Sequence, residues 1–499
     1  MGESVYSNYP PPLNPAQKAF LVTTVKDWAV QNGLMVRPAP TFVAKESNPH
    51  GVLATNAPVT LFPSPFPRTC FEEATALQTV YNQLLIDVDD FISRLWNVHQ
   101  SVKNEGYTQT LSLGLYRSDY MAHSPSDAST PSLKQVEFNT ISSSFGGLSS
   151  LVASLHTELL DSPPGHPIAY PSHPLFESNV PPENTAVETL SAGLATAHKA
   201  YGLSKSTPSL PTCILFVVQE NERNTFDQLA LFKQLTKVHK LPVFRLLSSQ
   251  ILDHTSVQSS NPSRPLIYRP PHSPESQFEV STVYLRCFYA PSDYNTERDW
   301  EARTQLERSA AIKCPTVLNQ LAGCKVVQQV LAEDAGPNHL ASFLDNTDPH
   351  VMARLRKTFA PQYDLSTNGR GRELALNPDT AANHVLKPQR EGGGNNIYKT
   401  AIPEFLNSIP ESEWKRWILM ELITPPSEAK NVALRSDGEV LGGDVIGELG
   451  VYGTILWDQA GGKVLHNEQG GWLMRTKAKD VNEGGVATGF SSLDSILLF

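Results

Sequence analysis

The chain has 499 residues, 40% of them apolar, which is enough for a sizeable core and for roughly two to four domains. Charged residues make up 18%, below the ~25% usual in globular proteins, so a charge-driven disordered chain is excluded. The net charge of −10 argues against a broad basic surface for nucleic acid.

Nothing in the sequence predicts a membrane span, a leader peptide or a disulfide framework. The longest strongly apolar run, residues 213–218, is far shorter than the ~20 residues that cross a bilayer. The N-terminus lacks the basic and apolar regions of a signal peptide. The five cysteines are scattered and never form a CxxC pair, which fits reduced thiols. We therefore expect a cytoplasmic protein that binds neither membranes nor nucleic acid.

The first 200 residues contain three predicted helices. Asn14 and Pro15 are a good N-cap and first helical position, and Gly33 ends this first helix. A longer helix is predicted over residues 69–98, because apolar residues keep a spacing of three and four throughout. The third helix is expected at about residues 147–161, before a linker rich in proline and serine.

Between residues 211 and 290 the pattern changes to alternating strands and helix, which is typical of a small parallel α/β unit inserted as a domain. Strands are expected at 213–218, 242–247 and 282–288, and a helix at 225–235. Further helices are expected at 297–311 and 326–333, and Ser436, Asp437 and Gly438 signal a hairpin. The fold class is predicted as mixed α/β, divided into residues 1–209, 210–312 and 313–499.

A glycine-rich turn that follows a short apolar strand gives the sharpest chemical signal. The strand leads through Lys387 to Glu391, and the turn consists of Gly392, Gly393, Gly394, Asn395 and Asn396. Consecutive glycines let backbone N–H groups converge on an anion. Lys387 adds a fixed positive charge, and Glu391 offers hard oxygen ligands to Mg²⁺. We interpret the turn as a nucleotide phosphate loop; the alternative is a hairpin tip with solvated charges.

A second candidate site lies on the strand that ends near residue 139. Strand side chains alternate, so Glu137 and Asn139 share one face and can bind Mg²⁺ through a carboxylate and an amide oxygen. The serine-rich turn that follows offers hydroxyl and N–H groups to an anionic substrate. Taken alone, the pair fits a solvated strand face equally well.

Six basic residues stand at the edges of predicted strands and turns: Arg117, Arg286, Lys313, Lys387, Arg475 and Lys477. A nucleoside triphosphate and a carboxylate substrate together bring about five negative charges, and two like charges at 4 Å repel by ~4 kcal/mol at an effective dielectric near 20. Fixed cations and metal ions are needed to gather such substrates.

The order of these motifs resembles the eukaryotic-type glutathione synthetase family of the ATP-grasp superfamily. The likeness runs from about residue 15 to 490 and includes LGLYRSDYM (113–121), VEFNTISSSFGGL (136–148), QENERNTFDQ (219–228), LKPQREGGGNN (386–396) and EGGVATG (483–489). The resemblance implies an ATP-grasp fold with an inserted α/β substrate-binding domain and a glycine-rich lid at about residues 358–443.

The resemblance also implies roles for individual residues. The Mg²⁺ ligands are Glu137, Asn139 and Glu391. The nucleotide side consists of Glu137, Lys313, Lys387, Glu391, Gly392, Gly393, Gly394, Asn395, Asn396, Tyr398, Met420, Glu421, Ile423, Glu448, Lys477 and Glu483. The substrate contacts are Arg117, Ser142, Ser143, Ser144, Glu222, Arg223, Asn224, Gln228, Arg286, Tyr289, Arg475, Val486 and Ala487. Arg117, Lys387 and Arg475 are expected to act in catalysis.

The sequence departs from the family pattern in a few places. Leu422 stands where the family often has lysine, and Cys287, Phe288 and Thr488 differ from common forms. Only a minor ATP contact is affected by Leu422, because backbone contacts to adenine survive a side-chain change. The tract at 255–277, rich in proline and serine, is interpreted as a surface insertion.

The resemblance implies ligation of γ-glutamylcysteine to glycine, driven by ATP and Mg²⁺ through an acyl phosphate, by a cytoplasmic homodimer. Two alternatives stay open: a ligase with another acceptor, such as β-alanine or serine, and a non-catalytic ATP-binding module of the same fold. Arg475 is expected to clamp a substrate carboxylate; the alternative is a surface arginine paired with Asp480 or Glu483.

Overall fold

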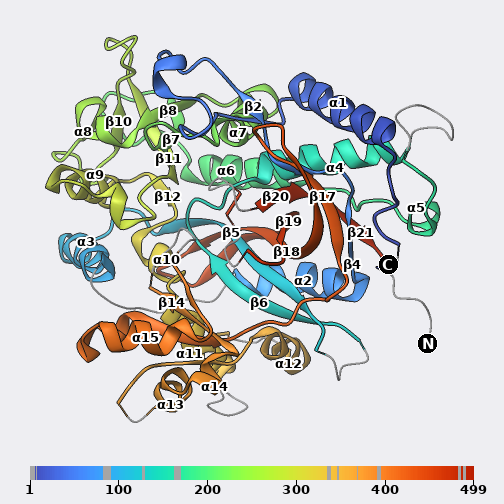
Figure 1. Ribbon diagram of the computed structural model, residues 1–499. Coiled ribbons are helices and arrows are strands. Elements are labelled where there is room, and N and C mark those ends of the chain that lie inside the picture. Colours follow the sequence, from blue (N-terminus) through green and yellow to red (C-terminus); the bar gives the residue numbers. More distant parts are fainter. Residues whose placement is uncertain are drawn as a thin grey trace.

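The computed structural model describes residues 6, 8–82, 91–125, 130–161, 170–333, 339–344, 348–367, 369–389, 395–481, 485–486 and 491–499. Within these residues the strands form a central sheet of seven strands, a sheet of six, a sheet of four and two short pairs. In Figure 1 the six-stranded sheet lies above the central sheet and the four-stranded sheet lies below it. The mixed α/β fold class is confirmed.

The central sheet has the strand order β17-β3-β20-β19-β18-β5-β6. Its middle is antiparallel: β19 pairs with β18, β18 with β5, and β5 with β6. The strands are β3 (Val59–Thr60), β5 (Leu111–His123), β6 (Ser132–Asn139), β17 (Lys430–Leu434), β18 (Val440–Asp458), β19 (Lys463–Ala478) and β20 (Ser491–Asp494). The sequence signal at 436–438 is confirmed as the hairpin between β17 and β18, where Gly438 has a φ of 89°.

Helices pack on both faces of the central sheet. On one face lie α4 (Gly146–Leu160) and α6 (Ala186–Tyr201), and on the other lies α2 (Arg68–Tyr81). Trp472 and Leu473 are neighbours on β19, yet Trp472 packs in the α2 core and Leu473 in the α4 core. This division follows from the alternation of side chains along a strand.

The first predicted helix is confirmed as α1 (Pro15–Asn32), which Asn14 caps by accepting from the Gln17 N–H and which Gly33 ends at a φ of 78°. The single long helix predicted over residues 69–98 is wrong. The chain has two helices there, α2 and α3 (Phe91–Glu105), and residues 83–90 between them lie outside the described part. α2 packs on the central sheet, whereas α3 packs on α9 (Glu297–Arg308) and α10 (Val317–Leu321).

The six-stranded sheet confirms the predicted strands and helix of the 211–290 region. β8 (Val243–Leu247), β7 (Thr212–Val218), β11 (Phe278–Arg286) and β12 (Ile312–Cys314) are parallel neighbours, and α7 (Thr225–Lys237) connects β7 to β8. The tract at 255–277 is more than a surface insertion, because it contributes β9 (Thr255–Val257) and the buried β10 (Leu266–Tyr268) as antiparallel strands. The domain boundaries at 209 and 312 stay a prediction.

The four-stranded sheet falls within the predicted lid. Its order is β13-β16-β14-β15, and its core contains Leu386, Ile402, Leu406 and Leu419. Its strands are β13 (Gln362–Tyr363), β14 (His384–Pro388), β15 (Ile397–Tyr398) and β16 (Trp417–Glu421), and the helices beside them are α13 (Arg370–Leu376), α14 (Pro378–Ala381) and α15 (Ala401–Ser408).

The other elements are β1 (Met35–Val36), β2 (Thr55–Asn56), β4 (Ser64–Phe66), α5 (Pro174–Ser178), α8 (Ile251–His254), α11 (Lys325–Ala332), α12 (Pro349–Thr358) and β21 (Ile496–Leu498). α9 and α11 confirm the helices predicted at 297–311 and 326–333, with ends shifted by at most three residues. Among the described residues, no helix is both long and apolar enough to cross a membrane.

One buried carboxylate on β20 ties three strands of the central sheet to β4 of a neighbouring pair. Asp494, which is fully buried, accepts from the hydroxyls of Thr60 at 2.7 Å, Ser64 at 2.5 Å and Thr476 at 2.6 Å. The Ser495 N–H donates to the same carboxylate at 2.7 Å. These bonds link β3, β4, β19 and β20. Because the donors are divided between Oδ1 and Oδ2, both carboxylate oxygens are needed as acceptors.

We predict that Asp494→Asn lowers the free energy of unfolding by about 1–3 kcal/mol, because the amide nitrogen cannot accept a hydrogen bond and leaves buried donors unsatisfied. Urea unfolding measures the change. Asp480→Asn, at an exposed position, is the matched control and is expected to leave the unfolding midpoint unchanged. Equal midpoints for the two variants would contradict the prediction.

Candidate active site

Asp119 on β5 is the centre of a buried ionic network. Its carboxylate accepts from Arg117 Nε at 2.6 Å and Arg117 NH2 at 2.9 Å, a bidentate pair. Arg475 NH2 and Asn139 Nδ2 each donate to Asp119 Oδ2 at 2.9 Å. Charge-assisted bonds of this kind are the strong ones in proteins. One carboxylate that the sequence analysis did not single out therefore joins three of the predicted site residues.

Gly450 on β18 has no side chain, and the Arg117–Asp119 ion pair occupies the space where a side chain would lie. Gly450 is the β-sheet partner of Asp119, and an added Cβ would lie 2.7 Å from Arg117 Cδ and 2.8 Å from Asp119 Oδ1. Real Cβ atoms do not approach neighbouring atoms so closely, so any side chain at this position displaces the ion pair. The glycine is required by the packing of its neighbours.

Arg475 on β19 faces inward, not toward solvent. Its side chain is 12% exposed, and it pairs with Asp119 and with Glu448, its cross-strand partner on β18. Burial opposes the charge of Arg475, but Glu448 and Asp119 outweigh it and raise the arginine pKa. Burial raises the pKa of Glu448. The alternative of a surface arginine is therefore wrong; Glu483, one of the partners suggested for it, lies outside the described residues.

Glu137, near the end of β6, lies among cations. Its Oε2 is 3.1 Å from Lys325 Nζ, and Lys387 Nζ on β14 donates to the neighbouring Val136 carbonyl oxygen at 2.7 Å. Burial acts to raise the pKa of Glu137, but Lys325, Lys387 and Arg475 hold it well below its usual range. Burial lowers the pKa of Lys387 to about 8. The structure thus brings together predicted metal and phosphate residues from distant parts of the chain.

The donor set at the end of β6 fits Mg²⁺. Glu137 offers a carboxylate, and the amide nitrogen of Asn139 is used by Asp119 and by the Arg117 carbonyl oxygen, which leaves the amide oxygen for a ligand. Hard oxygen ligands are those that Mg²⁺ prefers. Glu391, predicted as the third ligand, lies outside the described residues. Within the described residues, no three His, Cys, Asp or Glu side chains form a metal site by themselves.

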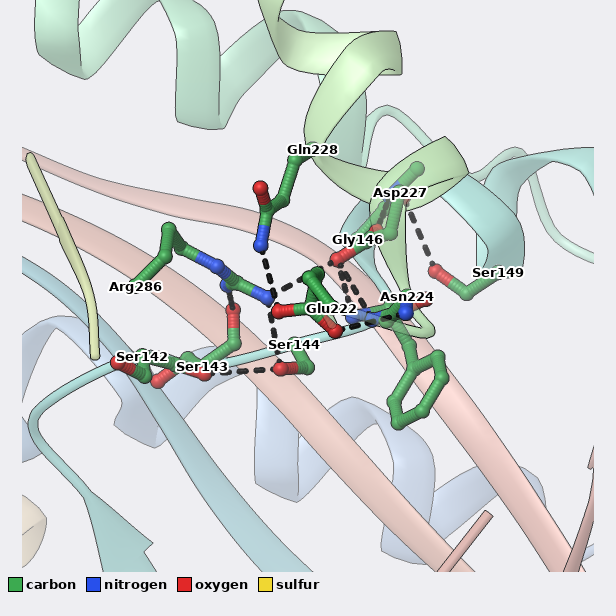
Figure 2. A network of polar contacts seen from close by, with 12 residues as sticks. Ser142, Ser143, Ser144, Gly146, Ser149, Glu222, Asn224, Asp227, Gln228 and Arg286 are labelled. Atoms are coloured by element: carbon green, nitrogen blue, oxygen red, sulfur yellow. Dashed lines mark hydrogen bonds and ion pairs between the residues drawn. The ribbon is translucent and has the colours of Figure 1, made fainter. Parts of the chain in front are cut away.

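The serine turn of residues 142–144 is held by its carbonyl oxygens (Figure 2). Arg286 NH1 donates to the Ser143 carbonyl oxygen at 2.9 Å, and Arg286 NH2 donates to Ser144 Oγ at 2.8 Å. Arg117 NH1, at 3.1 Å, and the Tyr452 hydroxyl, at 2.6 Å, both donate to the Ser144 carbonyl oxygen. Two predicted substrate arginines, from β5 and β11, therefore meet on this turn.

Asp227, in the first turn of α7, anchors the other end of the serine turn. Its carboxylate accepts from the Phe145 N–H at 2.9 Å and the Gly147 N–H at 2.7 Å, and it lies 3.4 Å from Arg286 NH2 (Figure 2). The sequence analysis did not assign Asp227 a role, although it lies inside the quoted QENERNTFDQ motif. The available signal in the sequence was that Asp227 directly precedes Gln228, which is a predicted substrate contact.

Glu222 organises the remaining substrate residues. Its carboxylate accepts from the Asn224 N–H and from Gln228 Nε2, both at 2.7 Å, and Arg245 NH2 donates to Gln228 Oε1 at 2.9 Å. Arg245, on β8, is a further residue that sequence reasoning missed. The Tyr289 hydroxyl donates to Gln219 Oε1 at 3.1 Å.

Arg223 and Val486 lie on a neighbouring cavity of about 330 Å³, which Asn224 and Lys477 also line. Arg223 Nε donates to the Arg37 carbonyl oxygen at 3.2 Å. Ser142 Oγ donates to the Leu285 carbonyl oxygen at 3.1 Å, which secures the start of the serine turn on β11. Ala487 and Glu483 lie outside the described residues.

The structure does not bring Lys313 to Glu137 by any contact between described residues. Lys313 Nζ is buried on β12 and donates to the Ser309 carbonyl oxygen at 3.0 Å. Burial lowers its pKa to about 8, and the charged groups around it include Glu307, Arg303 and Arg264. An ATP contact by Lys313 stays a prediction.

The predicted adenine residues border an apolar cluster between β14 and β16. Val385 and Met420 are buried there with Ala360, and Tyr398, Leu422 and Ile423 pack against them. Glu421 accepts from the Tyr363 hydroxyl at 2.9 Å, and Asn396 Nδ2 donates to the Tyr398 hydroxyl at 3.2 Å. Gly392, Gly393 and Gly394 lie outside the described residues. Apolar side chains beside a buried lysine are chemically suited to a nucleotide, which has an apolar base and anionic phosphates.

Comparison with known proteins gives a consistent result. A family model described as eukaryotic glutathione synthase, ATP binding domain, matches residues 15–498. The chain belongs to this family. It is 36% identical to the glutathione synthetase large chain of Schizosaccharomyces pombe, over 97% of this chain and 98% of that one. It is also 36% identical to glutathione synthetase of Rattus norvegicus, over 94% of each chain.

A solved structure extends the comparison to the fold. A glutathione synthetase-like effector from Globodera pallida has a TM-score of 0.72 and 21% identity, and the match covers 98% of this chain and 99% of that one. The predicted family resemblance and the ATP-grasp fold of the glutathione synthase family are thus confirmed. The family members are ATP-dependent ligases, and so is this chain.

We predict that Gly450→Ala lowers ligase activity at least tenfold, because the methyl group displaces Arg117 and Asp119, and the arginine loses about 1.5–3 kcal/mol of charge-assisted bonding. Gly443→Ala, on the same strand, is the matched control, because its Cβ meets nothing within 4 Å. Steady-state turnover and thermal melting of both variants check the prediction. Normal turnover in Gly450→Ala would show that the pair tolerates displacement.

Proposed function

We propose that this chain joins γ-glutamylcysteine to glycine, with ATP converted to ADP and phosphate, and so forms glutathione. The proposal is carried by membership of the glutathione synthase family over nearly the whole chain. The convergence of Arg117, Arg475 and Lys387 from three strands supports it, because substrates that carry several negative charges need such cations.

The reaction needs an activated carboxylate, since oxide is too poor a leaving group for direct attack by an amine. In the proposed sequence, the γ-phosphoryl group moves from ATP to the cysteinyl carboxylate, and ADP leaves. The amine of glycine then attacks the acyl carbon, the C–O bond to phosphate breaks, and the amine proton is lost. Positioning and charge stabilisation account for most of the catalysis in phosphoryl transfer.

Arg117 and Arg475 keep donors for a substrate. In the bonds between described residues, Arg117 uses three of its five N–H groups, on Asp119 and the Ser144 carbonyl oxygen. Arg475 Nε is buried without a hydrogen-bond partner among the described residues. A buried donor without a partner costs free energy, which a substrate carboxylate would recover. We therefore assign carboxylate binding to Arg475 and stabilisation of the developing oxyanion to Arg117.

The proposed nucleotide site lies beside these arginines. Lys387 is assigned to the phosphates, and Glu137, Asn139 and Glu391 to Mg²⁺, which when bound would neutralise phosphate charge. Met420 and Ile423 are assigned to adenine binding. Exclusion of water is expected to matter, because an acyl phosphate hydrolyses readily. As the family resemblance implies, we also propose a cytoplasmic homodimer; sedimentation of the purified protein tests its oligomeric state.

The function is tested by incubating the purified protein with ATP, Mg²⁺, γ-glutamylcysteine and one acceptor at a time. ADP release and the mass of the product are measured with glycine, β-alanine and serine. Glutathione formed most rapidly with glycine is the expected result. A preference for another acceptor would correct the substrate, and ATP binding without any product would favour a non-catalytic module.

We predict that kcat/KM for ATP falls as the pH rises through about 8. The buried ammonium of Lys387 has its pKa lowered to about 8, so the charge that binds phosphate is present below that pH and lost above it. Lys387→Arg keeps the charge at high pH and should flatten this limb, whatever its effect on the maximal rate. A wild-type profile that is level from pH 7 to 9.5 would contradict the assignment.

We predict that Arg475→Lys lowers kcat/KM for γ-glutamylcysteine about ten- to a hundredfold, while KM for ATP changes little. Lysine keeps the charge beside Asp119 and Glu448 but loses the rigid fork of donors. Kinetics in which one substrate is varied at a time separate the two effects. A change confined to ATP would move Arg475 out of the substrate site.

A further inference from the structure

Arg245, in the middle of β8, is a cation to which neither the sequence motifs nor the family resemblance assigned a role. Its NH2 donates to Gln228 Oε1 at 2.9 Å, and its backbone is in register with Phe216 on β7. The side chain is partly buried, and its Nε has no hydrogen-bond partner among the described residues. A strand inside a packed sheet therefore holds this guanidinium beside α7, which carries Gln228.

The amide of Gln228 lies between a group that only donates and a group that only accepts. Its oxygen accepts from Arg245, and its nitrogen donates to Glu222 Oε2 at 2.7 Å. Figure 2 shows this nitrogen directed at Glu222 and the oxygen on the other side of the amide. The reversed amide would place N–H groups against a guanidinium and an oxygen against a carboxylate. Because Gln228 is 1% exposed, water does not replace either bond, so the two charged groups fix one orientation.

Glu222 and Asn224 keep oxygen acceptors for a ligand. The Glu222 carboxylate takes one N–H from Asn224 and one from Gln228, whereas a carboxylate can accept about four hydrogen bonds. Asn224 Nδ2 donates to Asp227 Oδ2 at 3.2 Å, and Asn224 Oδ1 is buried without a partner among the described residues. γ-Glutamylcysteine keeps a free ammonium group on its glutamyl residue. Of the substrate contacts that the resemblance implies, Glu222 is the one carboxylate, so it suits this ammonium.

The charges around Glu222 make its position dependent on Arg245. Burial lowers the pKa of Arg245, Glu222 opposes this shift, and Arg286 adds to it, so the three charged groups lie near one another. Removal of Arg245 would leave Gln228 Oε1 as a buried acceptor without its donor, which costs free energy. The amide would then be free to turn away from Glu222, and the carboxylate would lose one of its two N–H donors.

We propose that Arg245 is a positioning residue for the amino end of γ-glutamylcysteine: it fixes the Gln228 amide, which in turn holds the Glu222 carboxylate for the ammonium group of the dipeptide. This inference rests on the proposed function, because it takes γ-glutamylcysteine as the substrate. Arg245 acts through Gln228 and does not need to contact the dipeptide itself.

Dipeptide binding by the full-length protein tests the proposal without any turnover. Calorimetric titration with γ-glutamylcysteine, at saturating Mg²⁺ and non-hydrolysable ATP analogue, should show binding about tenfold weaker in Arg245→Met than in wild type. Arg245→Lys should recover part of the loss, because it keeps the charge and a donor. Arg269→Met is the matched control: Arg269 is also partly buried and donates to Ser256 Oγ at 3.1 Å, and this variant should bind as wild type does. Unchanged dipeptide affinity in Arg245→Met would overturn the proposal.

A double-mutant cycle separates positioning through Gln228 from a general role in the fold. Once Gln228→Met has removed the amide, Arg245→Met should weaken dipeptide binding little further, because the two residues act as one unit. Additive losses would overturn the proposal, and so would a loss of affinity for the ATP analogue together with a lower melting temperature. A wild-type protein that binds the dipeptide but forms no glutathione would refute the proposed function, whereas the cycle judges Arg245 separately.

Discussion

The structure around the site depends on burying several cations next to one another. Arg117, Arg475, Lys325 and Lys387 are buried or nearly so, and each faces at least one of three carboxylates: Asp119, Glu137 and Glu448. Moving a charge out of water costs several kcal/mol unless a partner compensates it. The carboxylates therefore stabilise the folded chain while the substrates are absent. Within the described part of the chain, these four cations outnumber the three carboxylates, which leaves positive charge for anionic substrates.

The antiparallel sheet provides the geometry for this arrangement. Register places Glu448 opposite Arg475 and Gly450 opposite Asp119, so the acidic and basic groups of three neighbouring strands lie close together. The other side of β19 carries Trp472 and Met474 into the apolar core, which fixes the orientation of the strand. A shift of one residue would exchange the two faces. The hydrophobic core thus determines where the charged groups point.

Local patterns in the sequence predicted the elements that depend on local chemistry. The N-cap at Asn14, the buried strand β7 and the β17–β18 hairpin are of this kind. Periodicity failed for residues 69–98, because a continuous apolar stripe looks the same whether it faces one core or two. In the structure, α2 and α3 face separate cores.

Residues that act through distant partners were the ones the sequence did not reveal. Asp119 and Asp227 both lie inside the family motifs, but their partners are up to 356 residues away in the chain, as for Arg475 and Asp119. No spacing rule links such positions. The resemblance supplied roles for ligand contacts, whereas the carboxylates that orient those contacts became visible only in three dimensions.

A continuous set of bonds connects the two proposed halves of the site. Arg286 and Arg117 hold the serine turn on the substrate side, Arg117 pairs with Asp119, and Asp119 pairs with Arg475, which meets Glu448 on the nucleotide side. Most of these groups stand on strands of packed sheets, which hold atoms more precisely than exposed loops do. If the substrates bind as proposed, sheet geometry sets the distance between the carboxylate to be activated and the phosphoryl donor. A substrate carboxylate that draws Arg475 toward itself weakens the hold on Asp119 and hence on Arg117, so the binding of the two substrates should be coupled through this one buried carboxylate.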